Sequence, residues 1–428
     1  MRALVVGGGL AGLAAALELV DAGAAVTLFE ARRTLGGAVQ TLPAREGDPP
    51  PPPDNGQHIG LGCCVEYLRF LDRIGQSDAV MRLRLRMPVI DERGVVAYLG
   101  AGPGPLLRYG HLSVRERLTV ALVARRLGQL DPDAHDGESF GDLLRRFGTD
   151  ARTIERFWDV FIRPALNLPC DEASAALGVF TVQTAMLSTP QASDLLLPIA
   201  PLGSMHGDAA GRALEAAGAM VRARTRVARV EPGTVTTADG ERVETDAVVV
   251  ALPPGESAAV LGEPARRLEP SPIVSVHLLF DRQLLRPPLA GLLGSPAHWV
   301  FDRGRLTGHA PPRGQYLTVV SSGVPELASV RGRELVEQIA GALTDRLGRA
   351  ELLWSRVSRE PEATFACRPG TAILRCGPES GMPGVVRAGA WTDTGWPGTM
   401  ESAILSGRRA AQALLASRPV ATVDGAAR

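Results

Sequence analysis

The first forty residues constrain the fold of this 428-residue chain more than any other stretch. An apolar run at 4–6 leads into three glycines with the spacing G-x-G-x-x-G, namely Gly7, Gly9 and Gly12. An Ala- and Leu-rich segment follows, and a second apolar run at 25–29 ends at the acidic Glu30. Strand, glycine turn, helix, strand and acid in this order are typical of a Rossmann-like dinucleotide-binding unit.

Each position of this fingerprint has a physical reason. Gly7 allows the tight turn, Gly9 lets a pyrophosphate approach the backbone, and Gly12 lets the helix pack closely on the strand. The free N–H groups at the start of the helix favour an anion. Glu30 can accept hydrogen bonds from a ribose hydroxyl. The segment therefore predicts a dinucleotide cofactor.

Two other interpretations of the apolar N-terminus are a secretory signal and a membrane span. Only one basic residue, Arg2, precedes the apolar run, and Glu18 and Asp21 interrupt the following segment. A membrane span needs about 20 apolar residues, and the glycine turn would break it. We therefore expect a cytoplasmic protein.

The composition limits the chemistry. Forty-six basic and 46 acidic residues give a net charge of zero, which indicates no nucleic-acid partner. Every basic residue is arginine, so a lysine Schiff base or a lysine general base is excluded. The five cysteines and seven histidines have no metal-ligand spacing, so we expect no metal and free thiols.

The order of predicted elements indicates an α/β protein with two discontinuous parts. We expect a Rossmann-like dinucleotide-binding domain and an α+β substrate domain with a mixed sheet and helices. The predicted dinucleotide-binding domain comprises 1–80, 208–260 and 360–418, the predicted substrate domain comprises 81–207 and 261–359, and 419–428 form a flexible tail. The sequence predicts a mainly helical region at 65–130 and helices at 333–347 and 398–415. It predicts strands at 222–230, 242–252, 273–280 and 316–321. The proline-rich segment 46–55 is expected to be an exposed insertion.

The segment after Glu30 makes the prediction more specific. Gly36 and Gly37 complete the pattern E-x-x-x-x-x-G-G, and Ala388-Gly389 precede a C-terminal helix that contains Glu401-Ser402-Ala403. In these features the chain resembles the flavin amine oxidase and carotenoid desaturase superfamily. That resemblance implies FAD, with Gly36 and Gly37 close to the diphosphate and the flavin.

Within that superfamily the chain is most similar to the hydroxysqualene dehydroxylases. The similarity lies in four stretches, namely DNGQH at 54–58, PALN at 164–167, SDLLLP at 193–198 and WTDTGWP at 391–397. It implies a C30 isoprenoid substrate, the conversion of hydroxysqualene to squalene by reduced FAD, and a role in squalene and hopanoid biosynthesis. The reductant that regenerates the reduced cofactor is not indicated by the sequence.

The resemblance also implies which residues surround the cofactor and the reaction. Gly56 would let the flavin ring stack closely, and the free N–H groups of Thr399 and Met400 would face its pyrimidine edge. The candidates for an acid are His58, Asp54 and Asp393, in that order. The full set expected around FAD is Gly7, Gly9, Gly12, Glu30, Arg32, Arg33, Gly36, Gly37, Gly56, Val227, Gly389, Thr399 and Met400.

The chain departs from the superfamily pattern at two positions. Ala38 stands where relatives usually have an arginine that supports the phosphates, and Ala390 stands where they have an acid that holds the ribityl chain. Each change removes a hydrogen bond that involves a charged group. Arg32 or Arg33 is the expected substitute for the missing arginine.

Two apolar segments fit more than one role. Residues 195–199 and 106–130 are candidates for the mouth of a lipid tunnel or for a peripheral contact with the inner face of the membrane. Core packing beneath a solvated arginine face explains the second segment equally well.

Three other functions compete with the dehydroxylase. A polyene desaturase would transfer hydride in the opposite direction, from the substrate to the oxidised flavin. An amine oxidase often needs a lysine, which this chain lacks. A non-catalytic flavoprotein that binds an isoprenoid is the third, and Ala38 and Ala390 keep it open.

Overall fold

The nucleotide half of the molecule is a five-stranded parallel sheet, as the glycine fingerprint predicted. The computed structural model describes residues 1–417, so the tail predicted at 419–428 lies outside the described residues. Sheet order is β18-β12-β1-β2-β8, with all neighbours parallel. Its strands come from three separate parts of the chain: β1 (Arg2–Val6) with β2 (Ala25–Phe29), β8 (Met220–Arg222) with β12 (Ala247–Val250), and β18 (Val385–Arg387). This is the predicted discontinuous Rossmann-like arrangement.

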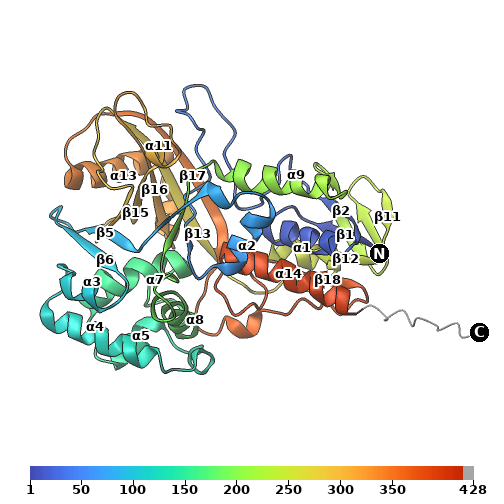
Figure 1. The fold of residues 1–428 in the computed structure, drawn as a ribbon, viewed down its shortest axis with the longest axis horizontal. Coiled ribbons are helices and arrows are strands. Elements are labelled where there is room, and N and C mark those ends of the chain that lie inside the picture. The colour runs from blue at the N-terminus through green and yellow to red at the C-terminus, as the bar shows by residue number, and fades with distance from the viewer. Residues whose placement is uncertain (418–428) are drawn as a thin grey trace, which may run out of the picture.

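Two long helices cover one face of this sheet. α1 (Leu10–Asp21) begins directly after the glycine turn, and α14 (Met400–Ala416) packs against it at the right of Figure 1. The packing is so close that a Cβ on Gly407 would lie 2.0 Å from the carbonyl oxygen of Ala11. Three further helices belong to this half, namely α2 (Val65–Arg73), α9 (Ala209–Ala216) and α10 (Pro254–Leu261), together with the antiparallel strands β9 (Val227–Glu231), β10 (Thr234–Thr237) and β11 (Arg242–Glu244).

The other half is built on a mixed sheet of order β17-β13-β16-β15-β14-β5-β6. Its strands are β5 (Arg86–Ile90), β6 (Val96–Gly100), β13 (Pro270–Phe280), β14 (Leu289–Leu292), β15 (Trp299–Asp302), β16 (Gln315–Ser322) and β17 (Leu352–Phe365). One face packs on α12 (Pro325–Ser329) and α13 (Gly332–Leu347) through a core that includes Val276, Leu317 and Ile339. The long β13 and β17 reach from this sheet toward the nucleotide half (Figure 1).

A helical layer lies below the mixed sheet in Figure 1. It consists of α3 (Pro103–Arg108), α4 (Val114–Leu127), α5 (Phe140–Arg146), α6 (Ala151–Thr153), α7 (Asp159–Leu166) and α8 (Ala175–Thr181), with π-helical turns at Ile154–Trp158 and Val182–Leu187. A third π-helical turn, Ser204–Asp208, precedes α9, and short 3-10 turns lie at Ser77–Ala79, Pro132–His135 and Ala372–Leu374. The four-residue α11 (Arg303–Leu306) follows β15.

The helical prediction for 65–130 was partly wrong. The strands β4 (Val80–Leu83), β5 and β6 lie inside this range. β5 pairs in parallel with β14, about 200 residues further along the chain, and β4 pairs with β7 (Leu195–Pro198). These segments form strands because distant partner strands bury them and supply their hydrogen bonds. A local sequence pattern does not show such partners.

Two further expectations need correction. The segment 195–199 was considered as a surface that meets lipid, but β7 is the buried central strand between β3 (Gly60–Leu61) and β4. The proline-rich 46–55 was expected to be exposed, but only part of it is. Asp48 and Asp54 are buried there, and each forms an ion pair with an arginine of the mixed-sheet half.

The predicted domain boundaries stay a proposal. β17 runs from Leu352 to Phe365 and so crosses the boundary placed at 360. Among residues 1–417, no helix combines the length and the apolar character that crossing a membrane requires.

Candidate cofactor and active site

The glycine turn and the start of α1 form a cradle made of backbone. A Cβ on Gly7 would lie 2.3 Å from the carbonyl oxygen of Ala251, and one on Gly12 would lie 1.9 Å from that of Gly7. Gly9, in contrast, has open space, with Gly37 Cα at 3.7 Å from its ideal Cβ. The first N–H groups of α1 have no acceptor within the helix, so they can bind an anion that approaches over Gly9.

Glu30 closes one end of this cradle. Its two carboxylate oxygens accept hydrogen bonds from the backbone N–H groups of Gly8 and Arg32, each at 2.7 Å. A carboxylate oxygen has a second lone pair, so Glu30 retains acceptor capacity for ribose hydroxyls. The backbone N–H of Thr225 donates to the Glu30 carbonyl, which brings the segment before β9 alongside. Val227 is the first residue of β9 and is buried.

The second pair of glycines lies directly against the first turn. The N–H of Gly36 donates to the carbonyl of Gly8 at 2.8 Å, and a Cβ on Gly37 would lie 2.7 Å from Gly9 Cα. Gly36 and Gly37 have φ angles of +111° and +61°, which favour glycine. The backbones of the two predicted motifs therefore meet, and side chains are excluded between them.

Arg32, rather than Arg33, lies next to the position of the missing arginine. The Arg32 guanidinium donates to the carbonyl oxygen of Gly37 at 3.4 Å. The carbonyl of Ala38 accepts a hydrogen bond of 2.7 Å from Asn55, which ties this turn to the loop at 54–58. Arg33 is exposed. Of the two expected substitutes, the geometry favours Arg32.

The loop before α14 is held by hydroxyl groups and one buried arginine. Gly389 donates its N–H to Ser406 Oγ at 2.9 Å, and Ser402 Oγ donates to the Ala390 carbonyl at 3.0 Å. Arg375 donates to the carbonyls of Ala390 and Thr392 and stacks on Phe365. Arg375 forms no ion pair with a carboxylate of residues 1–417, and burial lowers its pKa. These contacts fix the backbone where the usual acid is absent.

The start of α14 offers an anion-stabilising end, with one change from the prediction. The N–H of Thr399 is bonded to the Pro397 carbonyl at 2.8 Å, and its hydroxyl caps the N–H of Ser402. Of the two predicted N–H groups, only that of Met400 lies in the first turn without an acceptor in the helix. The Glu401 side chain turns away and caps α2 through the N–H groups of Glu66 and Tyr67.

Asp54, a predicted acid, is fully engaged. Its carboxylate lies 2.5 Å from the Arg303 guanidinium and also accepts from the Thr41 hydroxyl at 2.7 Å and the Leu202 N–H at 3.0 Å. Burial raises the pKa of Asp54, while these three donors lower it. With every oxygen in contact with a donor, this carboxylate is arranged to hold a loop in place.

His58 is half-buried and lies near a second histidine. Burial lowers the pKa of His58 to about 4. It lies near His206, whose Nδ1 faces the Leu202 carbonyl at 2.9 Å and whose Nε2 lies 3.0 Å from the Tyr67 hydroxyl. Since Nδ1 must carry the proton to donate to a carbonyl, Nε2 accepts from Tyr67. The arrangement leaves His58 as the one predicted acid that is both sheltered and free of an ion pair in the described chain.

Asp393 forms no hydrogen bond or ion pair with the loop at 54–58 in the described part of the chain. It is exposed, and its carboxylate accepts only the N–H of Gly395, at 3.3 Å, among the contacts of residues 1–417. The tryptophans beside it pack inward. Trp391 donates to the Leu252 carbonyl at 3.0 Å, and Trp396 packs edge-on against Phe180.

Comparison with known proteins agrees with this geometry. The sequence profile of the family described as flavin containing amine oxidoreductase matches residues 10–415. The chain belongs to this family. Because the cradle is built for a dinucleotide and the family uses a flavin, the cofactor is FAD, and the protein is an FAD-dependent oxidoreductase.

Relatives with established names include hydroxysqualene dehydroxylases. Those of Rhodopseudomonas palustris and Sinorhizobium fredii are 29% and 27% identical, and each alignment covers 96% of this chain and 98% or 97% of the relative. A 15-cis-phytoene desaturase of Solanum lycopersicum is 26% identical over 97% of this chain and 78% of its own length.

Two solved structures have the same fold as this chain. An oxidoreductase from Methanosarcina mazei superposes with a TM-score of 0.74 at 18% identity and covers 95% of this chain and 99% of its own. Cyclohexylamine oxidase from Brevibacterium oxydans gives a TM-score of 0.72 at 18% identity, with 96% and 98% covered. The fold is therefore that of the flavin amine oxidoreductases.

Sequence reasoning missed the residues that reach this site from the mixed-sheet half. Arg303 and His277 contact the segment at 54 from α11 and β13. Glu360 of β17 lies beside Asn55 and Arg32, and burial raises its pKa. The only available signal was polar residues inside apolar strands, such as Ser275 and His277 in PSPIVSVHLLF.

Proposed function

We propose that this oxidoreductase removes the hydroxyl group of hydroxysqualene reductively and releases squalene. The observation that carries the proposal is similarity to two hydroxysqualene dehydroxylases along 96% of the chain, including both halves of the fold. The absence of lysine supports it, because amine oxidases of this superfamily often place a lysine at the flavin. The role would lie in squalene and hopanoid biosynthesis.

In the proposed reaction the allylic C–O bond breaks and the hydroxyl leaves as water after gaining a proton. When bound, reduced FAD supplies the hydride that forms the new C–H bond. The residues of the chain would orient the allylic carbon, exclude water from the electron-poor carbon, and deliver the proton. Gly7, Gly9, Gly12, Gly36 and Gly37 would hold the cofactor.

His58 is the first choice for the proton donor. Asp54 is engaged by Arg303, and Asp393 is exposed, so both rank below it. A histidine with a pKa of about 4 is a strong acid when protonated, but only about one molecule in a thousand carries the proton at pH 7. The reaction should therefore accelerate as the pH falls.

The alternative is a desaturase that removes hydride from a phytoene-like polyene. The specific observation in its favour is the 26% identity to a phytoene desaturase over 97% of this chain. Both reactions need the same cradle and a long apolar substrate, so the fold is compatible with either.

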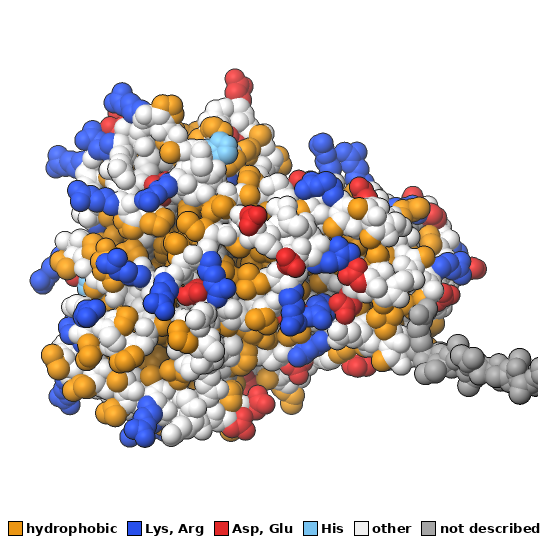
Figure 2. All heavy atoms as spheres, in the orientation of Figure 1, with side chains coloured by type: hydrophobic (Ala, Val, Ile, Leu, Met, Phe, Trp, Pro, Cys, Tyr) orange, Lys and Arg blue, Asp and Glu red, His pale blue; other side chains and the backbone are white. Residues whose placement is uncertain are grey.

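We also propose that α3 and α4 touch the membrane surface from which a C30 substrate must be taken. Val114, Leu118 and Leu122 follow each other at four-residue intervals on α4 and are 69%, 55% and 62% exposed. Leu107 on α3 is 62% exposed. Figure 2 shows orange side chains with arginines among them at the lower left, where Figure 1 places these helices.

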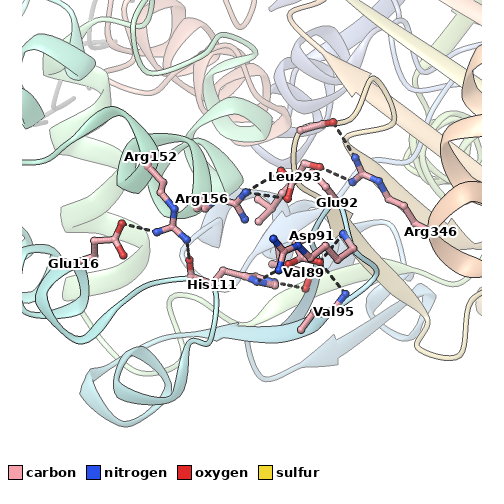
Figure 3. Close-up of polar contacts among 12 residues, drawn as sticks. Val89, Asp91, Glu92, Val95, His111, Glu116, Arg152, Arg156, Leu293 and Arg346 are labelled. Atoms are coloured by element: carbon pink, nitrogen blue, oxygen red, sulfur yellow. Dashed lines mark hydrogen bonds and ion pairs between the residues drawn. The ribbon is translucent and has the colours of Figure 1, made fainter.

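The charges around this apolar stripe fit an anionic bilayer. Arg108, Arg115 and Arg125 are exposed and form no ion pair among residues 1–417. Glu116, the only acid of α4, points inward and pairs with Arg152 at 2.5 Å (Figure 3). A stripe of apolar residues beside unpaired arginines is the pattern of a helix that lies in the headgroup region.

The network in Figure 3 holds this surface on the mixed-sheet half. Arg152 also donates to the His111 carbonyl at 3.0 Å, and the His111 ring contacts the Val89 carbonyl of β5 at 2.9 Å. Glu92, two residues after β5, accepts from Arg156 of the helical layer at 2.9 Å. These contacts would hold α4 in a fixed position relative to the mixed sheet when it touches a membrane.

Vesicle co-sedimentation tests the membrane contact. Leu118→Glu combined with Leu122→Glu should lower binding to phosphatidylglycerol vesicles by about tenfold or more, since two apolar side chains lose burial. Ile373→Glu is the control, because Ile373 is 88% exposed elsewhere on the surface. Unchanged binding of the double variant, or equal loss in the control, would refute this surface.

The function itself is tested by anaerobic incubation with hydroxysqualene and reduced FAD, followed by analysis for squalene. Squalene formation is expected. No squalene, together with turnover of a polyene under an electron acceptor, would replace the proposal with the desaturase. A protein that binds no flavin and turns over neither substrate would favour the non-catalytic alternative.

A further inference from the structure

One face of the mixed sheet carries buried polar side chains beneath the loop at 54–58. Ser275 and His277 of β13 and Tyr316 and Thr318 of β16 all point to this face and have 0% exposure. The opposite face of the same strands is the apolar core with α12 and α13. Polar groups at such depth need a structural or functional reason, because burying them is unfavourable.

The centre of this polar face is the ion pair between Arg303 and Asp54. Their side chains are 1% and 2% exposed, and the guanidinium also donates to the Pro52 carbonyl at 2.7 Å. The Arg303 guanidinium lies over the Tyr316 ring, 5.9 Å from its centroid. Two residues separated by 249 positions thus join the loop to the mixed sheet.

His277 adds a neutral support at the same place. Its Nδ1 lies 3.0 Å from the Thr318 hydroxyl, and its ring lies next to the Asp54 backbone carbonyl. Burial lowers the pKa of His277 to about 3, helped by the charges of Arg303 and Arg356. The cluster therefore contains one positive and one negative charge.

The loop rests directly on this cluster. An ideal Cβ on Gly56 would lie 3.1 Å from Ser275 Oγ, so the Gly56 backbone lies close to the sheet face. Asp54 precedes Gly56 by two residues and is held from three sides, by Arg303, Thr41 and Leu202. These contacts fix Asp54 two residues before the point where the loop meets the sheet.

The cluster is poorly optimised for stability. Four of its buried atoms, Arg303 Nε, Ser275 Oγ, His277 Nε2 and Tyr316 Oη, have no well-aligned hydrogen-bond partner among residues 1–417. Apolar residues of similar shape often replace buried ion pairs without loss of stability. The polar groups therefore point to a role in specifying one geometry.

We propose that Asp54, Arg303 and His277 are positioning residues that set the Gly56–His58 loop against the bound flavin. This rests on the placement of Gly56 against the flavin ring that the resemblance implies, and on the proposed function for the identity of the substrate. It replaces the acid role first considered for Asp54. The cluster lies behind the loop and holds it, while His58 at the end of the loop stays available to the substrate.

The proline-rich segment at 46–55, which leads into this loop, contains a second buried ion pair that serves as a control. Asp48 and Arg356 are 5% and 6% exposed, and their charged atoms lie 2.5 Å apart. This pair joins the insertion to β17 at a position eight residues from Gly56. Both pairs link the segment at 46–55 to the mixed sheet. Arg356 is the cross-strand neighbour of His277, so the two pairs share that contact, but only Asp54 lies two residues from Gly56.

The test compares Asp54→Asn/Arg303→Met with Asp48→Asn/Arg356→Met in the full chain. Each double variant removes both charges, so neither leaves one charge buried without a partner. We expect both to melt within a few degrees of each other and of the parent. Only the first should weaken FAD affinity, by about tenfold, and change the visible absorption bands of the flavin, which report how the ring is packed.

Arg303→Lys should have a flavin spectrum between those of the parent and of Asp54→Asn/Arg303→Met. Lysine keeps the positive charge but lacks the planar guanidinium with its several N–H donors. Equal FAD affinity and an unchanged spectrum in Asp54→Asn/Arg303→Met would overturn the proposal, as would equal changes in the control. Affinity and spectrum need no substrate. A protein that shows the expected changes but forms no squalene would contradict the proposed function alone.

Discussion

The two sides of the candidate site are held together by different kinds of contact. On the nucleotide side, Gly7, Gly12 and Gly37 let backbones touch, and a Cβ at these positions would come within 1.9 to 2.7 Å of a neighbouring backbone atom. On the substrate side, the ion pair of Asp54 and Arg303 holds the loop through side chains from distant segments. The nucleotide side depends on glycines that lack a Cβ, and the substrate side depends on a buried ion pair. Adding a side-chain atom should therefore damage the first side, and removing a charge should damage the second.

The largest effect should follow Gly12→Ala. The new Cβ would meet the Gly7 carbonyl oxygen at 1.9 Å. Neither atom can rotate away, because the oxygen belongs to the backbone and Cβ is bonded directly to it. We expect loss of bound flavin and destabilisation of about 3 kcal/mol or more, as for severe overpacking. Flavin content and urea unfolding measure it. Gly332→Ala, where nothing lies within 4 Å of the new Cβ, is the control and should change neither.

Arg303→Met alone should come next. It leaves the Asp54 carboxylate buried without its partner, which costs about 3 to 5 kcal/mol. Adding Asp54→Asn should recover most of that loss in urea unfolding. If the single and double variants are equally unstable, the ion pair is not what holds the loop, and the contrast between the two sides fails.

His58→Gln should lower turnover by about 100-fold if His58 is the acid. Because burial holds the pKa of His58 at about 4, the protonated fraction falls about tenfold for each pH unit above that value. Parent activity should thus rise as the pH is lowered from 7 toward 5, and the variant should lose this slope. A pH profile that is flat in both proteins would assign the proton to another group.

The smallest effect is expected for a substitution of Glu116. Its ion pair with Arg152 is partly exposed, in contrast to the buried pair of Asp54 and Arg303. Despite an opposing contribution from burial, hydrogen bonds from Ser113 and Arg152 lower the pKa of Glu116 to about 2. A lowered carboxyl pKa stabilises the fold above its usual value of 4.5 and loses this contribution as the pH falls toward 2. Glu116→Gln should therefore lower stability at pH 7 by less than about 1 kcal/mol, because Arg152 is 52% exposed, and the difference should vanish near pH 2. A pH-independent difference between the two melting curves would argue against the ion pair.

The same contrast explains what the sequence could predict. Gly7, Gly9, Gly12 and Glu30 lie within 24 residues, and their spacing reports local geometry, so the nucleotide sheet and its cradle were predictable. Arg303 lies 249 residues from Asp54, and no local pattern marks it as a partner. The strands β5 and β6 were missed for the same reason, since β5 is paired with β14.

The departures at Ala38 and Ala390 also needed the structure. The sequence showed what was missing, but only the fold places Arg32 at the Gly37 carbonyl and Arg375 at the Ala390 carbonyl. Arg32 was among the expected substitutes because it is near in sequence. Arg375 was not, because its contacts depend on how the loop at 390–394 folds back.

The most direct test of the proposed reaction follows the hydrogen that enters the product. The protein is incubated anaerobically in D2O with dithionite-reduced FAD and hydroxysqualene, and the product is analysed by mass spectrometry. Transfer of hydride from the reduced cofactor predicts squalene with one deuterium at the carbon that carried the hydroxyl group. Squalene without deuterium, or unchanged hydroxysqualene from a protein that holds flavin, would contradict the proposal.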